Sequence, residues 1–315
     1  MSDPVELSFV RTVKSRELLP EGVRVIAAVS GGSDSMALLH LLSSFGDHMG
    51  WDLSVLHIDH GMRPESSEEA EVVRRIAAEN GLPFRLRKLS PPETGSVEDA
   101  FSRARQAIYE EEAGTEGLVA VGHTASDRAE TVVMRLLEGS GPRGLSGMGF
   151  VGVGPVRRPL LGLTRGTLRD YLQRRGVDWL EDRSNLDTSL LRNKVRLELM
   201  PVLEEASPGC TERISSTAEL LGSWRDYMDR ELNALLPERE AGSDVRIVSR
   251  HAYREAHRAL RLMVLWHLSG RPRKGLLEME KTDRWLMSGK SGSHLLPGGE
   301  SVVADGEELR FESPS

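Results

Sequence analysis

Six residues near the start of the chain have a composition suited to binding phosphate. Ser30-Gly31-Gly32-Ser33-Asp34-Ser35 follows a short apolar run and opens a stretch with helical periodicity. Glycines permit backbone conformations in which consecutive N–H groups point toward one centre, and a helix N-terminus adds free N–H groups and partial positive charge. The serine hydroxyls supply further donors. The segment predicts a phosphate or pyrophosphate pocket; the alternative is a tight turn in which Ser or Asp only caps the helix.

A second polar segment contains a histidine and a carboxylate four residues apart, His123 and Asp127. Such a pair beside a phosphate loop suits binding of Mg²⁺ or deprotonation of an amine. Thr124-x-x-Asp127 also approximates a capping signal, so a purely structural role for Asp127 is the alternative. Two further histidines end another apolar run. We expect a structural role for His57 and consider His60 a candidate for nucleotide contact.

The elements that must position these residues alternate between strands and helices. Strands are expected at 23–29, 53–58, 84–89 and 118–121, and helices from the Ser-Gly loop to residue 45 and over 66–80, 97–113 and 125–138. This alternation predicts a doubly wound α/β domain with a parallel sheet. Ligands bind such sheets at the carboxyl ends of the strands, where both polar segments fall.

Composition limits the class of protein. A chain of 315 residues favours two domains, and 39% hydrophobic with 28% charged residues is typical of a globular protein. One cysteine, Cys210, excludes a disulfide framework or a thiolate metal cluster built from this chain alone. We find neither a signal-peptide pattern nor an apolar run of about 20 residues, so a cytoplasmic protein with no membrane contact is expected.

The loop is neither a Walker loop nor a dinucleotide-binding Gly-x-Gly-x-x-Gly. Its Ser-Gly-Gly-x-Asp-Ser pattern resembles the PP-loop ATP pyrophosphatases. Further motifs resemble the tRNA(Ile)-lysidine synthetases within that superfamily, over roughly residues 20–205. These motifs are His57–Arg63, Gly122–Thr131, Gly139–Met148, Arg158–Leu161 and Trp179–Asn185, followed by Arg192-Asn193, Arg196 and Leu199–Pro201.

The resemblance implies an ATP-dependent ligation. The C2 oxygen of the wobble cytidine in tRNA(Ile) with a CAU anticodon attacks the α-phosphate of ATP, and L-lysine then displaces AMP. It implies ATP and Mg²⁺ as cofactors, and related enzymes suggest a homodimer. The expected catalytic residues are Asp34, Arg105, His123, Asp127 and Arg192; Asp34 and Asp127 are also the expected metal ligands. Ser30–Ser35 and His60 are expected to contact ATP.

Two positions depart from the family pattern. Ile108 stands where the family has a second arginine before Tyr109. Glu138 stands where the family usually has arginine before the Gly-x-Gly loop, and a carboxylate cannot contact RNA phosphate as arginine would. The loop after Glu138 is therefore expected to serve substrate closure more than electrostatics.

Two segments concentrate positive charge in a chain whose net charge is −7. Residues 157–196 hold ten Lys or Arg against five acids, and residues 246–274 hold eight against one. Such runs are often only solvated surface, but they are also what an RNA backbone requires. We expect Arg250, Arg254, Arg258 and Arg261 to share one helix face. The expected RNA-binding residues are Arg158, Arg165, Arg196, Arg250, Arg254, Arg258 and Arg261.

The expected organisation is a PP-loop domain over 1–206, a helical linker over 207–240 and a small α+β tRNA-binding domain over 241–315, with a hairpin turn at Asp305-Gly306. Two other functions remain open. One is a PP-loop tRNA-modifying enzyme of the thiolase type that takes sulfur from an external carrier. The other is a non-catalytic nucleotide- or RNA-binding module.

Overall fold

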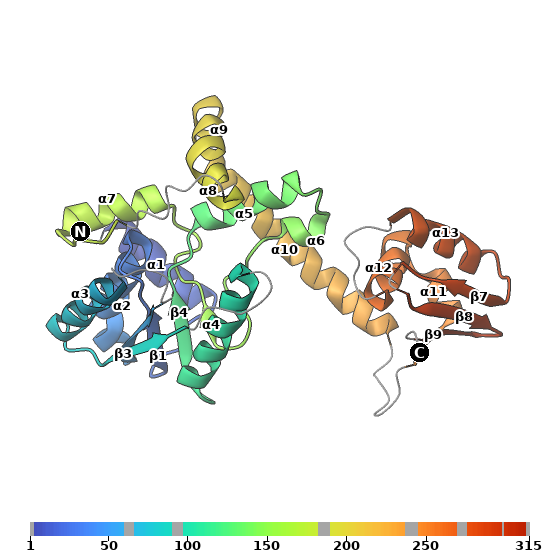
Figure 1. Ribbon diagram of the computed structural model, residues 1–315, viewed down its shortest axis with the longest axis horizontal. Helices are drawn as coiled ribbons and strands as arrows, with labels where there is room; N and C mark the ends of the chain where they lie inside the picture. The colour runs from blue at the N-terminus through green and yellow to red at the C-terminus, as the bar shows by residue number, and fades with distance from the viewer. Residues whose placement is uncertain are drawn as a thin grey trace. The chain divides into compact units, whose positions relative to one another are not determined.

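The computed structural model describes residues 3–59, 66–89, 97–181, 190–236, 245–269, 276–297 and 299–312. The chain divides into two compact units, unit 1 over Met1–Gly222 and unit 2 over Ser223–Ser315 (Figure 1). The helix α10, Cys210–Leu235, begins in unit 1 and ends in unit 2.

Unit 1 contains a five-stranded sheet of order β3-β2-β1-β4-β5, and every pair of neighbours is parallel. The doubly wound α/β prediction is thus confirmed. The strand order reverses between β1 and β4, which is where such sheets open a crevice for ligands. The strands are β1 Arg24–Ala28, β2 Asp52–Asp59, β3 Phe84–Lys88, β4 Leu118–Val121 and β5 Val156–Arg157.

Alternate residues of the strands enter two cores on opposite faces of the sheet. Val25 and Val55 pack with helices α1, α2, α3 and α7, whereas Ile26 and Leu56 pack with α4 (Figure 1). The helices of unit 1 are α1 Pro4–Ser15, α2 Ser33–Met49, α3 Ser66–Glu79, α4 Val97–Ala113, α5 Ala125–Leu137, α6 Pro142–Leu145, α7 Arg165–Arg175, α8 Leu191–Lys194, a π-helical turn Val195–Leu199, and α9 Met200–Ala206.

Both departures from the family pattern have a structural account. Ile108 packs against the core on the α4 side of the sheet, where an arginine would place a charge among apolar side chains. Glu138 follows the last turn of α5 and accepts a hydrogen bond from Arg135 at 2.9 Å. Glu138 therefore neutralises a neighbouring arginine at the helix end.

The helix that follows the serine–glycine loop is longer than predicted. We expected its end near Phe45, but α2 continues to Met49 and ends at Gly50, which adopts the left-handed conformation with φ +65°. Gly46 weakens the helical pattern in the sequence, yet it is buried inside α2, and a Cβ there would meet only Leu53 at 4.0 Å. Burial against β2 maintains the helix across this glycine.

Unit 2 contains a four-stranded antiparallel sheet of order β6-β9-β8-β7 together with helices. Its core includes Val248, Tyr253, Val264 and Phe311. The predicted β region is confirmed, but the hairpin loop is Gly306-Glu307, one residue later than expected, and β6 was not expected. The elements are β6 Arg246–Ser249, α11 Arg250–Glu255, α12 Arg258–Leu268, α13 Leu276–Met287, β7 Gly292–Leu295, β8 Ser301–Asp305 and β9 Glu308–Glu312.

The prediction that four arginines of unit 2 share one face of a single helix is wrong. Two separate helices, α11 and α12, carry them, and His257 caps the second helix. Arg250 is buried and donates to the carbonyls of Gly306 and Lys290 at 3.2 and 2.7 Å. Arg261 donates two hydrogen bonds to Asp283. These two arginines stabilise unit 2, while Arg254 and Arg258 remain exposed.

Candidate functional site

The serine–glycine loop between β1 and α2 is held by its own side chains. The Ser35 hydroxyl accepts from the Ser30 amide at 3.2 Å and donates to the Gly32 carbonyl at 2.9 Å. Gly31 has φ +94°, and a Cβ there would lie 2.8 Å from Leu180. The N-cap of α2 is Gly32, which has no side chain to cap with. The simple capping alternative therefore does not apply, and the first N–H groups of α2 are left for an anion.

The carboxyl end of β4 approaches this loop very closely. A Cβ on Gly122 would lie 3.1 Å from the carbonyl carbon and oxygen of Asp34 and 3.1 Å from the Cα of Ser35. These atoms are backbone and cannot rotate away. Glycine at this position is what brings His123, the next residue, beside the start of α2.

Asp127 performs two tasks with its two oxygens. Its Oδ2 accepts from the amide and hydroxyl of Thr124 at 2.8 and 2.7 Å and so completes the cap of α5. Its Oδ1 accepts from Arg165 at 2.9 Å and from Arg192 and Arg196 at 3.2 Å each. The capping and functional interpretations of Asp127 are thus compatible.

Arg165, the first residue of α7, connects three carboxylates. Its Nε donates to Asp34, its Nη2 to Asp127 and its Nη1 to Glu130, each at 2.9 Å. Arg196 contacts two of these carboxylates: it donates to both Glu130 oxygens at 2.9 Å and to Asp127. We call Asp34, Asp127, Glu130, Arg165, Arg192 and Arg196 the acid–arginine cluster.

Burial and charge set the protonation of the cluster. Burial alone would raise the pKa of Asp127, but the guanidinium groups of Arg165 and Arg192, the His123 ring and the Thr124 hydrogen bond lower it to about 2. Burial and the nearby Asp127 charge raise the pKa of Asp34, against the opposing effect of Arg165. Three carboxylates raise the pKa of Arg165 despite its burial. At neutral pH Arg165 is charged and Asp127 is ionised.

His123 is neutral in this environment. Burial lowers its pKa to about 4; Asp127 opposes the shift, and the charges of Arg158, Arg192 and Arg105 add to it. The Nε of Arg158 donates to its Nδ1 at 3.2 Å. The charge of Arg105 on α4 thus acts at this site. His57, by contrast, is buried with Nδ1 2.8 Å from the Val29 carbonyl, in a structural position.

The structure brings together most of the expected site residues. Ser30–Ser35, His123, Asp127, Arg158, Arg165, Arg192 and Arg196 all lie around the carboxyl ends of β1 and β4. Three of the arginines expected to contact RNA are engaged here, Arg165 and Arg196 by carboxylates and Arg158 by His123. Their RNA-binding role stays a prediction. His60 and Asp182–Asn185 lie outside the described residues.

Sequence reasoning missed two members of the site. Glu130 lies three residues after Asp127 on the same face of α5 and is buried. That spacing beside a predicted catalytic carboxylate was the available signal. Arg169 on α7 donates to the Ser33 hydroxyl at 3.3 Å, a contact that no local pattern announces because 136 residues separate the two.

The donors present suit Mg²⁺ in its usual protein setting. Magnesium is commonly held by one or two carboxylates together with substrate phosphates. Asp34 and Asp127 accept from the same guanidinium and lie beside the phosphate loop, which fits that mode. In the described part of the chain no three His, Cys, Asp or Glu side chains form a ready metal cage.

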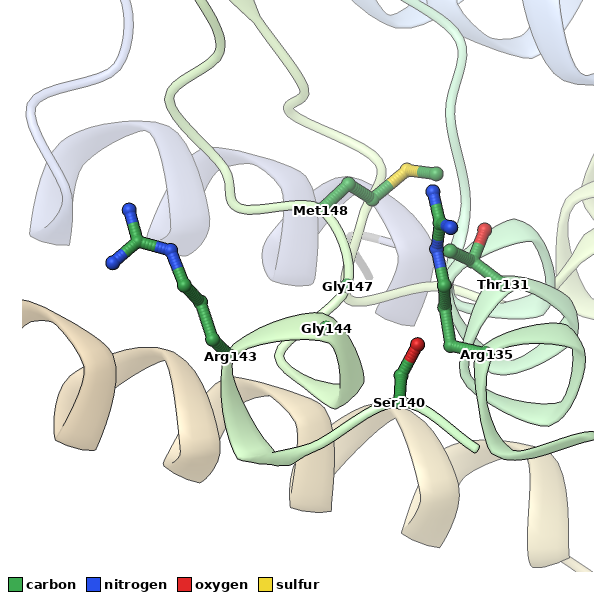
Figure 2. Close-up of a pocket in the computed structure, with 7 residues that line it drawn as sticks. All are labelled: Thr131, Arg135, Ser140, Arg143, Gly144, Gly147 and Met148. Carbon is green, nitrogen blue, oxygen red and sulfur yellow. The ribbon is translucent and has the colours of Figure 1, made fainter. Parts of the chain in front are cut away.

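A cleft of about 340 Å³ lies beside α5, lined by Thr131, Arg135, Ser140, Arg143, Gly144, Gly147 and Met148. Figure 2 shows Arg135 and Arg143 on opposite sides, with Ser140 and Gly144 between them. Thr131 donates to the Asp127 carbonyl at 2.7 Å, so this Arg135–Arg143 cleft begins one helical turn from the cluster.

None of the described helices is long and apolar enough to cross a membrane.

Known proteins resemble the chain at three levels. The PP-loop domain family matches residues 5–203. A solved structure, the U34-tRNA thiolase NcsA from Methanococcus maripaludis with its [4Fe-4S] cluster, superposes with a TM-score of 0.58 at 17% identity. The match covers 69% of this chain and 78% of that one. This likeness concerns the fold.

Curated relatives are closer in sequence. The tRNA(Ile)-lysidine synthase of Solibacter usitatus is 40% identical over 84% of this chain, which spans 59% of that protein. The corresponding protein of Geobacter sulfurreducens is 43% identical, and the chain spans 46% of it. That of Thermosynechococcus vestitus is 33% identical over 96% of this chain and 90% of its own length. With a PP-loop match over residues 5–203 and this near full-length relative, the chain belongs to the tRNA(Ile)-lysidine synthase family of PP-loop proteins.

Proposed function

We propose that the chain uses ATP to join the ε-amine of free L-lysine to C2 of the wobble cytidine in tRNA(Ile) with a CAU anticodon. The products are lysidine, AMP and pyrophosphate. Family membership supports the tRNA substrate. The observation that carries the proposal is that the PP loop, His123 and the acid–arginine cluster converge at the carboxyl ends of β1 and β4.

The first step is attack of the cytidine C2 oxygen on the α-phosphate. An O–P bond forms and the bond to the pyrophosphate breaks. The loop N–H groups and the Ser30 and Ser33 hydroxyls would hold the two outer phosphates, where negative charge accumulates, while Ser35 holds the shape of the loop. Mg²⁺, held by Asp34 and Asp127 with these phosphates, would neutralise part of that charge.

The second step is attack of the lysine ε-amine on C2. A C–N bond forms, and AMP leaves with the former C2 oxygen. Lysine binds as an ammonium ion, which must lose one proton before the attack and a second one once the C–N bond has formed. The step therefore needs anionic groups that hold the ammonium ion and accept protons. The carboxylates of Asp34, Asp127 and Glu130 have that chemistry. Arg105 and Arg192 would stabilise phosphate or the adenylated base.

The tRNA would contact several separate surfaces. The Arg135–Arg143 cleft contains two guanidinium groups and the Ser140 hydroxyl beside the site, suited to a phosphodiester. In unit 2, Arg254 and Arg258 are the exposed members of the arginine set. We assign both surfaces to the RNA backbone, and unit 2 to tRNA binding. We further propose that the protein functions in the cytoplasm and that it forms a homodimer.

One assay tests the function. The chain is incubated with ATP, Mg²⁺, labelled lysine and an unmodified tRNA(Ile) transcript with a CAU anticodon. We expect label in the tRNA and tRNA-dependent release of one pyrophosphate per lysine. Sulfur incorporation from a donor, with no lysine, would instead establish a thiolase. Binding of ATP or tRNA without pyrophosphate release would establish a non-catalytic module.

A further inference from the structure

Arg158 and His123 form a contact that fixes where the imidazole carries its proton. Arg158 Nε lies 3.2 Å from His123 Nδ1. A guanidinium has only donors, so the Nδ1 atom at this contact must be the acceptor and carries no hydrogen. A neutral imidazole whose Nδ1 accepts bears its hydrogen on Nε2.

The Arg158 side chain is itself held in place. Its Nη1 donates to the Gly149 carbonyl at 2.9 Å, and its backbone amide donates to the Phe150 carbonyl at 2.8 Å. A Cβ on Gly152 would lie 2.9 Å from the same Nη1 atom, so the neighbouring backbone is shaped around the guanidinium. Because Arg158 is anchored at two points, its Nε donor presents to the ring in one direction.

We propose that Arg158 is a positioning residue that holds His123 as the neutral Nε2–H tautomer, so that His123 serves as a hydrogen-bond donor and not as the base. The acceptor would be an anionic oxygen of the bound nucleotide or of the adenylated cytidine. This inference rests on the proposed function, and it shifts the removal of the amine proton from His123 to the carboxylates of the acid–arginine cluster.

The charges around the ring agree with this assignment. Arg158, Arg192 on α8 and Arg105 on α4 all disfavour an imidazolium, and Asp127 on α5 favours one. A donor that stays neutral can bind a developing anion without reorganising its own charge. His123 neither gains nor loses a proton during the reaction.

The tautomer can be observed directly in the full-length protein. Histidine is labelled with ¹⁵N, and the His123 resonances are assigned by their loss in His123→Gln. Long-range ¹H–¹⁵N correlation distinguishes a ring nitrogen that bears hydrogen from one that does not. We expect hydrogen on Nε2 in the unaltered protein and a tautomer mixture in Arg158→Met. A protonated Nδ1 in the unaltered protein, or the same pure tautomer in Arg158→Met, would overturn the proposal.

Activity gives an independent readout. We expect Arg158→Met to lower kcat by about a hundredfold, the scale of a lost transition-state donor, with KM for ATP unchanged. Arg158→Lys keeps a donor and should recover part of kcat. His123→Gln keeps an N–H donor and should retain more activity than His123→Ala. Equal inactivity of the two His123 variants would support a base and contradict a donor.

A neighbouring arginine provides the matched control. Arg157 donates to the backbone carbonyls of Gly154 and Val156. Arg157→Met should leave the His123 resonances and kcat unchanged, and thermal melting of every variant reports whether it folds. If the unaltered chain fails to incorporate lysine, the proposed function is wrong, but the tautomer measurement still tests the assignment to Arg158.

Discussion

Asp34 and Arg165 are 131 residues apart in the chain, yet Arg165 Nε lies 2.9 Å from Asp34 Oδ2. Each residue lies in the first turn of a helix, Asp34 in α2 and Arg165 in α7, and each side chain is 18% exposed. The same guanidinium binds Asp127 and Glu130. One residue thus contacts all three carboxylates, while Arg192 and Arg196 pair with two of them, Asp127 and Glu130.

Replacing Arg165 should therefore destabilise unit 1. We expect Arg165→Leu to lower the free energy of unfolding by about 3–5 kcal/mol, because it removes three ion pairs from a largely buried site and takes the arginine partner from Asp34. Urea unfolding measures the change. Arg174→Leu is the control, since Arg174 pairs with Asp3 from a side chain that is 52% exposed, and such pairs contribute about 1 kcal/mol or less. Similar losses in both variants would contradict a special role for Arg165.

Replacing Asp34 should affect catalysis more than the stability of the fold. Arg165 retains Asp127 and Glu130 when Asp34 is removed, so Asp34→Ala should fold normally. We expect lysine incorporation and pyrophosphate release to fall below detection, because a phosphate-side carboxylate is lost. Circular dichroism and melting check the fold. A folded Asp34→Ala that still incorporates lysine would refute the role given to Asp34.

His123 should make stability depend on pH in a defined direction. Its pKa is about 4 in the folded chain, against an ordinary value of 6.5. Between these values the unfolded chain binds a proton that the folded chain does not. Stability should therefore fall as pH drops from 6.5 to about 4, by up to about 3 kcal/mol. Urea titrations of the unaltered chain and His123→Gln at several pH values measure the difference, and parallel curves would exclude this source.

Local patterns in the sequence predict the sheet and the phosphate loop because strand, loop and helix are consecutive there. They do not predict the acid–arginine cluster, since Arg165 lies in a basic run that is typical of a solvated surface. Its partners come from α2 and α5, and only the packing of α7 beside them shows the relationship. Likewise, β6 was missed because its partner β9 lies at the other end of unit 2.

Gly122 is the sharpest steric prediction. A methyl group there would press on the backbone of Asp34 and Ser35 at 3.1 Å, so β4 or the start of α2 must shift. We expect Gly122→Ala to raise the dissociation constant for ATP at least tenfold, measured by calorimetry. Gly166→Ala is the control: it lies in α7 with nothing within 4 Å of a Cβ, and it should leave ATP binding unchanged. Equal ATP affinity in both variants would show that this close approach does not shape the loop.

The Arg135–Arg143 cleft should act on tRNA and not on ATP. Arg135 already pairs with Glu138, so a single reversal leaves a mixed charge, and the informative variant is the double change Arg135→Glu with Arg143→Glu. We expect KM for tRNA to rise about tenfold or more and its salt dependence to weaken, because phosphate contacts release counterions. KM for ATP should stay unchanged. The double change Arg11→Glu with Arg75→Glu, at exposed positions on α1 and α3, is the charge-matched control and should leave both constants unaltered. Unchanged KM for tRNA in the double variant would remove the cleft from the RNA-binding surface.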